Sequence, residues 1–132
     1  HLGCNTEIIF RASEAVQRTL PMDGKAGVLV KSEEDLVSVS NALAGEACAL
    51  TLTLGFDKAQ ESFSASPVQL GRLLVASGAF DGWQVIDLLA EANAVLGGCA
   101  SNYSASQMEE VLRRVNLNFV GGNTDKGFLR CP

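Results

Sequence analysis

The sequence predicts a single α+β domain in which a helical hairpin and further helices pack on a small mixed β-sheet, stapled by disulfides. Three observations predict this class. Apolar residues recur at helical spacing in some segments and alternate in others, which indicates helices and strands in one chain. The 132 residues suffice for a hydrophobic core and contain no linker-like segment, so residues 1–132 are expected to form one domain. The four cysteines favour disulfides.

The first thirty residues are predicted to form one helix and one strand. Residues 6–20 fit a helix that Pro21 would end. A strand over residues 8–10, followed by a short helix from Ser13, is the alternative for the same segment. Residues 26–31 are short, apolar and preceded by a turn signal, which favours a buried strand.

A second helix and a second strand are predicted next. Ser32 is a suitable helix cap, and the acidic residues Glu33, Glu34 and Asp35 suit the first turn of a helix that Gly45 would end. Residues 48–54 alternate between apolar and polar side chains, which is typical of a half-buried strand.

Residues 66–99 are predicted to form the helical hairpin around which the domain is built. Ser66 would cap its first arm and Gly78 would end it, and Asp81 would begin the second arm. Ile86 and Ala90 are expected to widen the apolar face of that second arm. The buried stripe itself is expected to consist of Val85, Leu88, Leu89, Ala92 and Leu96.

The last thirty residues are predicted to form a helix and two strands. Ser106 and Glu109 match a capping box. Residues 116–120 and 127–131 are predicted strands separated by a turn. The buried face of the helix is expected to contain Met108, Val111, Leu112 and Val115.

Composition excludes some partners. The net charge is −5 and the isoelectric point is near 4.8, which argues against nucleic acid and anionic membrane surfaces because both require a basic patch. No apolar run reaches the roughly 20 residues of a membrane span. Apolar residues nevertheless make up 47% of the chain, and the mean hydropathy is +0.17. This excess predicts a buried helix, an apolar pocket or a partner surface.

The cysteine positions predict two disulfides and an oxidising compartment. Cys4, Cys48, Cys99 and Cys131 show no metal-ligand spacing, and an even number in a small chain favours pairing. We expect Cys4–Cys131 to tie the termini and Cys48–Cys99 to tie the predicted strand to the hairpin. Four reduced, buried thiols in a cytosolic protein are the alternative. The missing initial methionine favours a removed signal peptide or membrane anchor.

The residues present argue against catalysis. His1 is the sole histidine and is terminal, so a Ser-His-Asp or Cys-His arrangement has no base. Phosphate-binding glycine motifs do not occur, and no cofactor or metal is expected. The acidic pairs, including Glu109 and Glu110, are attributed to a helix start and an exposed helix face. An enzyme that uses carboxylates is kept as an alternative.

We therefore expect a non-catalytic periplasmic or secreted interaction or sensory module, such as the outer part of a membrane-anchored regulator or an accessory protein. A small inhibitor or toxin-immunity protein is a further alternative, since acidic surfaces suit basic targets. Phe80 and Trp83 flank the predicted hairpin turn and are candidates for the edge of a surface that binds a protein partner, a second copy or a small apolar ligand. Folding back onto the core is the other interpretation of this pair.

Overall fold

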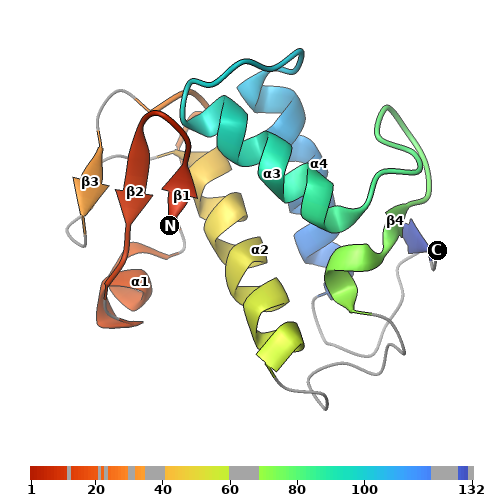
Figure 1. Ribbon diagram of the computed structural model, residues 1–132, viewed down its shortest axis with the longest axis horizontal. Coiled ribbons are helices and arrows are strands. Elements are labelled where there is room, and N and C mark those ends of the chain that lie inside the picture. Colours follow the sequence, from red (N-terminus) through yellow and green to blue (C-terminus); the bar gives the residue numbers. More distant parts are fainter. Residues whose placement is uncertain are drawn as a thin grey trace.

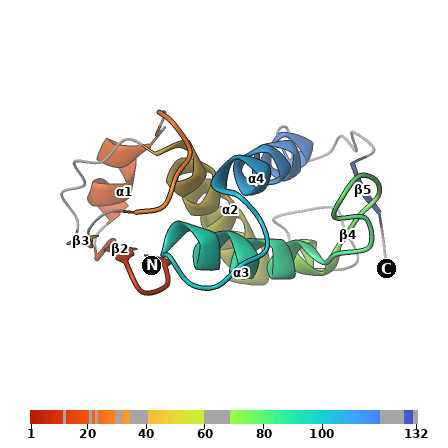
Figure 2. The same cartoon turned by 90° about the horizontal axis from the view of Figure 1, so that it is seen from above.

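A computed structural model shows the chain as an α+β domain, and the predicted class is confirmed. Within the described residues, four helices pack with a mixed three-stranded sheet and a separate two-stranded sheet. Helices α2, α3 and α4 occupy the middle, with β1, β2, β3 and α1 at one end and β4 at the other (Figure 1). The view from above places β5 beside β4 (Figure 2). The described residues are 1–11, 13–20, 22, 24–29, 32–34, 41–59, 69–119 and 128–130.

The three-stranded sheet is built at the N-terminus. Strand β2 (Glu7–Ile9) pairs antiparallel with β1 (Leu2–Gly3) and parallel with β3 (Glu33–Glu34), so the sheet is mixed as predicted. Helix α1 (Ser13–Thr19) follows β2. The single helix over residues 6–20 is therefore wrong and its alternative is confirmed. The pairing of β2 with two strands buries Ile8 completely and outweighs helical propensity here.

Helix α2 (Ala42–Ala59) replaces the predicted strand over residues 48–54. It begins at Asn41, whose side-chain oxygen accepts hydrogen bonds from the backbone N–H groups of residues 43 and 44 at 3.0 and 3.2 Å. The hydroxyl groups of Thr51 and Thr53 donate to the carbonyl groups four residues earlier, at 2.7 and 3.1 Å. These bonds satisfy the two threonines within a helix. Their alternation with leucine is therefore compatible with a helix and does not specify a strand.

Two further predictions before α2 are wrong. Glu33 and Glu34 lie in β3, so no helix begins at Ser32, and Gly45 lies inside α2. Residues 26–29 are irregular, although the Leu29 N–H donates to the Leu96 carbonyl at 2.8 Å. Residues 30–31 and 35–40, which also belong to these predicted elements, lie outside the described residues.

Only the second arm of the predicted hairpin is an α-helix. Residues 70–78 instead form a 3₁₀ turn, η1 (Leu70–Arg72), and strand β4 (Leu74–Val75). Backbone hydrogen bonds fold residues 73–85 into a loop, with the Val75 N–H donating to the Trp83 carbonyl and the Gly82 N–H to the Val75 carbonyl, both at 2.9 Å. These bonds and the pairing of β4 with the strand at residues 129–130 outweigh the helical spacing of the leucines. The predicted residues 66–68 lie outside the described part.

Helix α3 (Val85–Leu96) confirms the predicted buried stripe. It begins four residues later than Asp81, because residues 81–83 belong to the preceding turn. Ile86 is 47% exposed and Ala90 is also exposed, so these two residues do not widen the buried face as expected.

Helix α4 (Ala105–Phe119) confirms the predicted apolar face, whose four members are buried. Its capping box is formed by Ser104 and Gln107, two residues before the predicted pair, with reciprocal bonds of 2.9 and 3.2 Å. The helix continues through residues 116–119, so the predicted strand there is wrong. Strand β5 (Leu129–Arg130) lies within the predicted segment 127–131 and pairs antiparallel with β4.

The core lies between α2, α3 and α4, which contact one another in all three combinations. The fully buried side chains include Leu43, Leu50, Leu88, Leu96, Met108, Leu112 and Val115. Among the described helices, none has the length and apolar character needed to cross a membrane.

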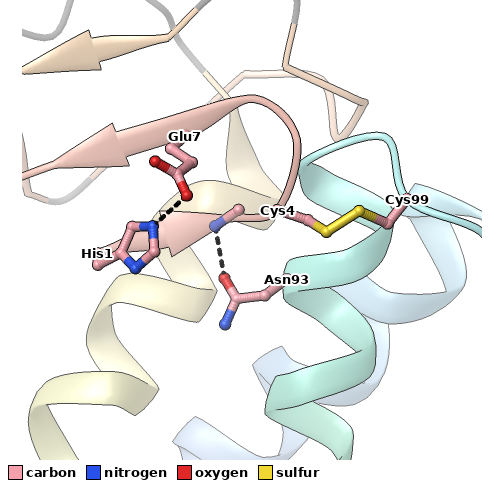
Figure 3. Close-up of a disulfide and its surroundings, with 6 residues drawn as sticks. His1, Cys4, Glu7, Asn93 and Cys99 are labelled. Atoms are coloured by element: carbon pink, nitrogen blue, oxygen red, sulfur yellow. Dashed lines mark hydrogen bonds and ion pairs between the residues drawn. A yellow bond between two sulfur atoms is a disulfide. The ribbon is translucent and has the colours of Figure 1, made fainter.

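The disulfide joins Cys4 to Cys99, which corrects both predicted pairings (Figure 3). The bond connects the turn after β1 to the segment just past α3. The backbone of Gly97 passes so close to Cys4 that a Cβ at position 97 would lie 1.9 Å from the Cys4 nitrogen. This contact brings Cys4 to Cys99 instead of Cys131. Cys48 is buried on α2 with a free thiol, and Cys131 lies outside the described residues.

Candidate functional site

The two predicted surface aromatics belong to a three-ring cluster. The ring centroids of Phe80 and Trp83 lie 5.2 Å apart, and Tyr103 lies 4.8 Å from Phe80 and 5.7 Å from Trp83. Phe80 is only 5% exposed, so it folds back onto the core, whereas Trp83 is half-buried. A partner surface at this turn stays a prediction, and Trp83 is the ring with accessible area for it.

A groove of about 600 Å³ lies beside this turn, between the second half of α2, η1 and the start of α3. Leu54, Ile86 and Leu89 supply most of its apolar lining. Gly71 lies against two of them, because a Cβ at this position would meet the Ile86 Cβ at 3.5 Å and a Leu54 methyl carbon at 3.8 Å. A glycine here therefore leaves open the space that a larger side chain would occupy.

The groove is also lined by charged and polar residues. Asp57 on α2 accepts a hydrogen bond from the Leu70 N–H at 2.8 Å and so ties α2 to η1. Lys58 and Arg72 lie on the rim with exposed side chains, and within the described ranges neither forms an ion pair with another residue. Gln69 and Gln84 add amide groups to the lining of the groove.

The turn and the groove are neighbours. Gln84 lines the groove and also a second depression that includes Trp83, Leu74 and Asp87. Trp83 is therefore the natural optical probe for events at the groove.

Sequence reasoning missed this groove. Its lining comes from residues 51–58, of which 51–54 were predicted as a strand, from residues 69–72, predicted as a helix, and from Gln84, Ile86 and Leu89 at the start of α3. One residue in the sequence could have indicated the groove. Ile86 is a large apolar residue next to the buried stripe of α3 and not part of it, so its side chain is exposed.

Several carboxylates have structural partners. Glu34 bonds Arg11, Glu91 accepts the hydroxyl of Ser101, and Glu110 lies 3.5 Å from Arg114. Glu46 accepts a bond of 2.7 Å from the amide of Asn116 and links α2 to α4. No grouping of three or more His, Cys, Asp or Glu residues suited to a metal ion occurs in the part of the chain that the structure describes.

The buried thiol of Cys48 has an altered acidity. Burial raises the pKa of this thiol, because the thiolate loses the solvation it would have in water, and the N-terminal amino group offsets the shift in part. A raised pKa keeps the thiol protonated, which is the unreactive form. Cys48 packs among the buried residues of the core.

Comparison with family models, curated proteins and solved structures finds no match to this chain.

Proposed function

We propose that the chain is a non-catalytic binding module that works outside the cytoplasm, in the periplasm or after secretion, and that the groove between α2, η1 and α3 holds its ligand. The groove carries this proposal. Its volume of about 600 Å³ lies in the range of small-molecule sites, roughly 300–1,000 Å³, and such sites combine an apolar lining with a few polar groups.

Rigid walls support the proposal. The Asp57–Leu70 bond fixes η1 against α2, and the Val85 N–H donates to the Leu73 carbonyl at 2.9 Å, which fixes the start of α3 next to η1. A site whose walls are held before binding loses less conformational entropy when a ligand enters.

The disulfide supports the compartment. Cys4 and Cys99 are separated by 95 positions in the sequence, and such bonds persist in oxidising surroundings. Sensing by the outer part of a membrane-anchored regulator is the biological role we propose for such a module.

The test uses a neutral apolar dye, Nile red, titrated into the oxidised protein. We expect a saturable, one-to-one increase in dye emission, together with a change in Trp83 emission. Gly71→Leu should abolish both signals by filling the groove, because the space next to Gly71 opens toward Leu54 and Ile86.

Gly27→Leu is the matched control. A Cβ at position 27 meets nothing within 4 Å, and Gly27 does not line the groove. This variant should bind the dye as the parent does. Unsaturable dye binding, or binding that Gly71→Leu leaves intact while its circular dichroism spectrum is unchanged, would reject the groove as the site.

A further inference from the structure

We infer that the ligand of the groove is an amphipathic carboxylate, with its apolar tail against Leu54, Ile86 and Leu89 and its carboxylate between Lys58 and Arg72. This inference rests on the proposed function and adds the chemical class of the ligand.

The charges at the groove carry the first step. Among the described residues that line it, the charged ones are Asp57, Lys58 and Arg72, whose formal charges sum to +1, whereas the whole chain carries −5. The Asp57 side chain is turned to the backbone, since its Oδ2 accepts the Leu70 N–H at 2.8 Å. Two cationic side chains therefore line this groove although the protein as a whole is acidic. Complementary charge favours an anionic ligand here.

The donors at the rim carry the second step. A guanidinium group offers a planar pair of N–H donors that matches a carboxylate, and a lysine ammonium group adds a compact positive charge. Gln69 and Gln84 also line the groove, and their amide groups supply neutral donors. An anionic head that leaves the groove at this rim would therefore find donors on α2 and η1 together.

The apolar lining carries the third step. Ile86 is 47% exposed on α3, and Leu54 is half-buried on α2. Covering such surface stabilises a complex by roughly 25 cal/mol for each Å² removed from water. A short, fully polar anion would leave these side chains uncovered, whereas the alkyl chain of a medium-length fatty acid would cover them.

The experiment compares three ligands with the same ten-carbon chain by isothermal titration calorimetry, below their aggregation concentrations. They are decanoate, neutral decanol and cationic decylamine. We expect decanoate to bind most tightly and decylamine most weakly. Raising the salt concentration should weaken the binding of decanoate and leave that of decanol nearly unchanged, because salt screens exposed charges.

Arg72→Gln and Lys58→Gln test the assignment of the head group. Each should weaken decanoate binding by about threefold to tenfold, as expected for a partly exposed charged contact, and should leave decanol affinity unchanged. Arg113→Gln is the matched control, because Arg113 is exposed on α4 and does not line the groove.

The outcomes separate this inference from the proposed function. Equal affinities for decanoate and decanol, with binding still blocked by Gly71→Leu, would overturn the inference and leave the binding module standing. A preference for decanoate that survives both glutamine substitutions would also overturn it. Failure of all three ligands and of Nile red would overturn the proposed function as well.

Discussion

Leu88 has no exposed surface and lies on α3, the helix that packs against both α2 and α4. We expect Leu88→Ala to lower the free energy of unfolding by roughly 2–5 kcal/mol, because it removes buried methyl groups and leaves a cavity. Urea titration measures this loss. Ile86→Ala is the control on the same helix, and its exposed side chain should cost far less. A Leu88→Ala loss below about 1 kcal/mol would contradict the packing.

Cys48 should make stability depend on pH in the alkaline range. Burial raises the pKa of the folded thiol above its value in the unfolded chain. The stabilisation is therefore complete below the unfolded pKa and is lost as pH rises toward the folded pKa, by at most about 1.4 kcal/mol per pH unit. Unfolding measured from pH 7 to pH 10 should show a steeper decline for the parent than for Cys48→Ala. Parallel profiles would contradict the assignment.

Individual buried positions were predictable where they lay on the central apolar stripe of a helix, whereas Ile86 and Ala90 beside the stripe of α3 are exposed. Leu88 and Met108 are examples, since each belongs to an apolar face whose members recur at helical spacing. Phe80 was ambiguous because an aromatic residue next to a glycine turn fits a surface or a core. Its contact with Tyr103, 23 positions away, places it in the core, and spacing alone does not encode that contact.

At the scale of elements, side-chain caps mark the start of α2 and of α4, whereas α3 begins without one. Ser104 and Gln107 form the box of α4, although Ser106 and Glu109 have the same spacing. We expect Ser104→Ala to cost about 1 kcal/mol, within the range of 0.5–2 kcal/mol for a lost cap. Ser106→Ala, exposed on the first turn, should be neutral or slightly stabilising because alanine has the higher helix propensity. The unfolding temperatures of both variants show which capping box forms. Equal losses of stability in the two variants would contradict the structure.

Three elements were mispredicted for one physical reason. Residues 48–54, 70–78 and 116–119 each carry a pattern that local spacing assigns to the wrong class. Tertiary contacts decide all three. Residues 48–54 belong to α2, which packs against α3 and α4, and residues 74–75 pair with a strand more than fifty residues later. Residues 116–119 stay in α4, where Asn116 donates to the Glu46 carbonyl at 3.0 Å. Helix α3 was predicted well because its own stripe suffices to bury it. The groove depends on the mispredicted segments, so it could not be foreseen.

At the scale of the whole molecule, the N-terminal sheet is attached to the helical core by the buried side chains of Leu2 and Ile8 and by hydrogen bonds. The Gly3 N–H donates to the Asn93 side chain at 2.9 Å, and the disulfide lies near Asn93 (Figure 3). The Thr6 N–H donates to the Gly97 carbonyl at 3.0 Å. The Asn41 amide donates to the Gly27 carbonyl at 2.9 Å and so connects the irregular residues 26–29 to the start of α2. The disulfide is thus the covalent member of a group of contacts that fastens the first thirty residues.

Removing this disulfide should be among the most destabilising of the changes considered. In the loop-entropy description, a bond that closes about 95 residues stabilises the fold by up to about 4–5 kcal/mol. Cys4→Ser combined with Cys99→Ser should lower the free energy of unfolding toward that amount. It should also raise the denaturant m-value, because the unfolded chain without the bond is less compact. Cys48→Ala is the control: it removes a buried thiol, should cost less, and should leave the m-value unchanged.

Peptide mapping under non-reducing conditions tests the connectivity directly. Digestion of the oxidised protein should release a peptide pair that joins Cys4 to Cys99, with Cys48 recovered as a free thiol only after unfolding. Hydrogen exchange should then show whether the disulfide stabilises the N-terminal sheet alone or the whole fold. If the bond fastens the sheet to the core, the double variant should exchange its Thr6 and Leu29 amides faster, while the amides of α4 keep their order of protection. Recovery of a Cys4–Cys131 or Cys48–Cys99 peptide would contradict the fold at its N-terminal attachment.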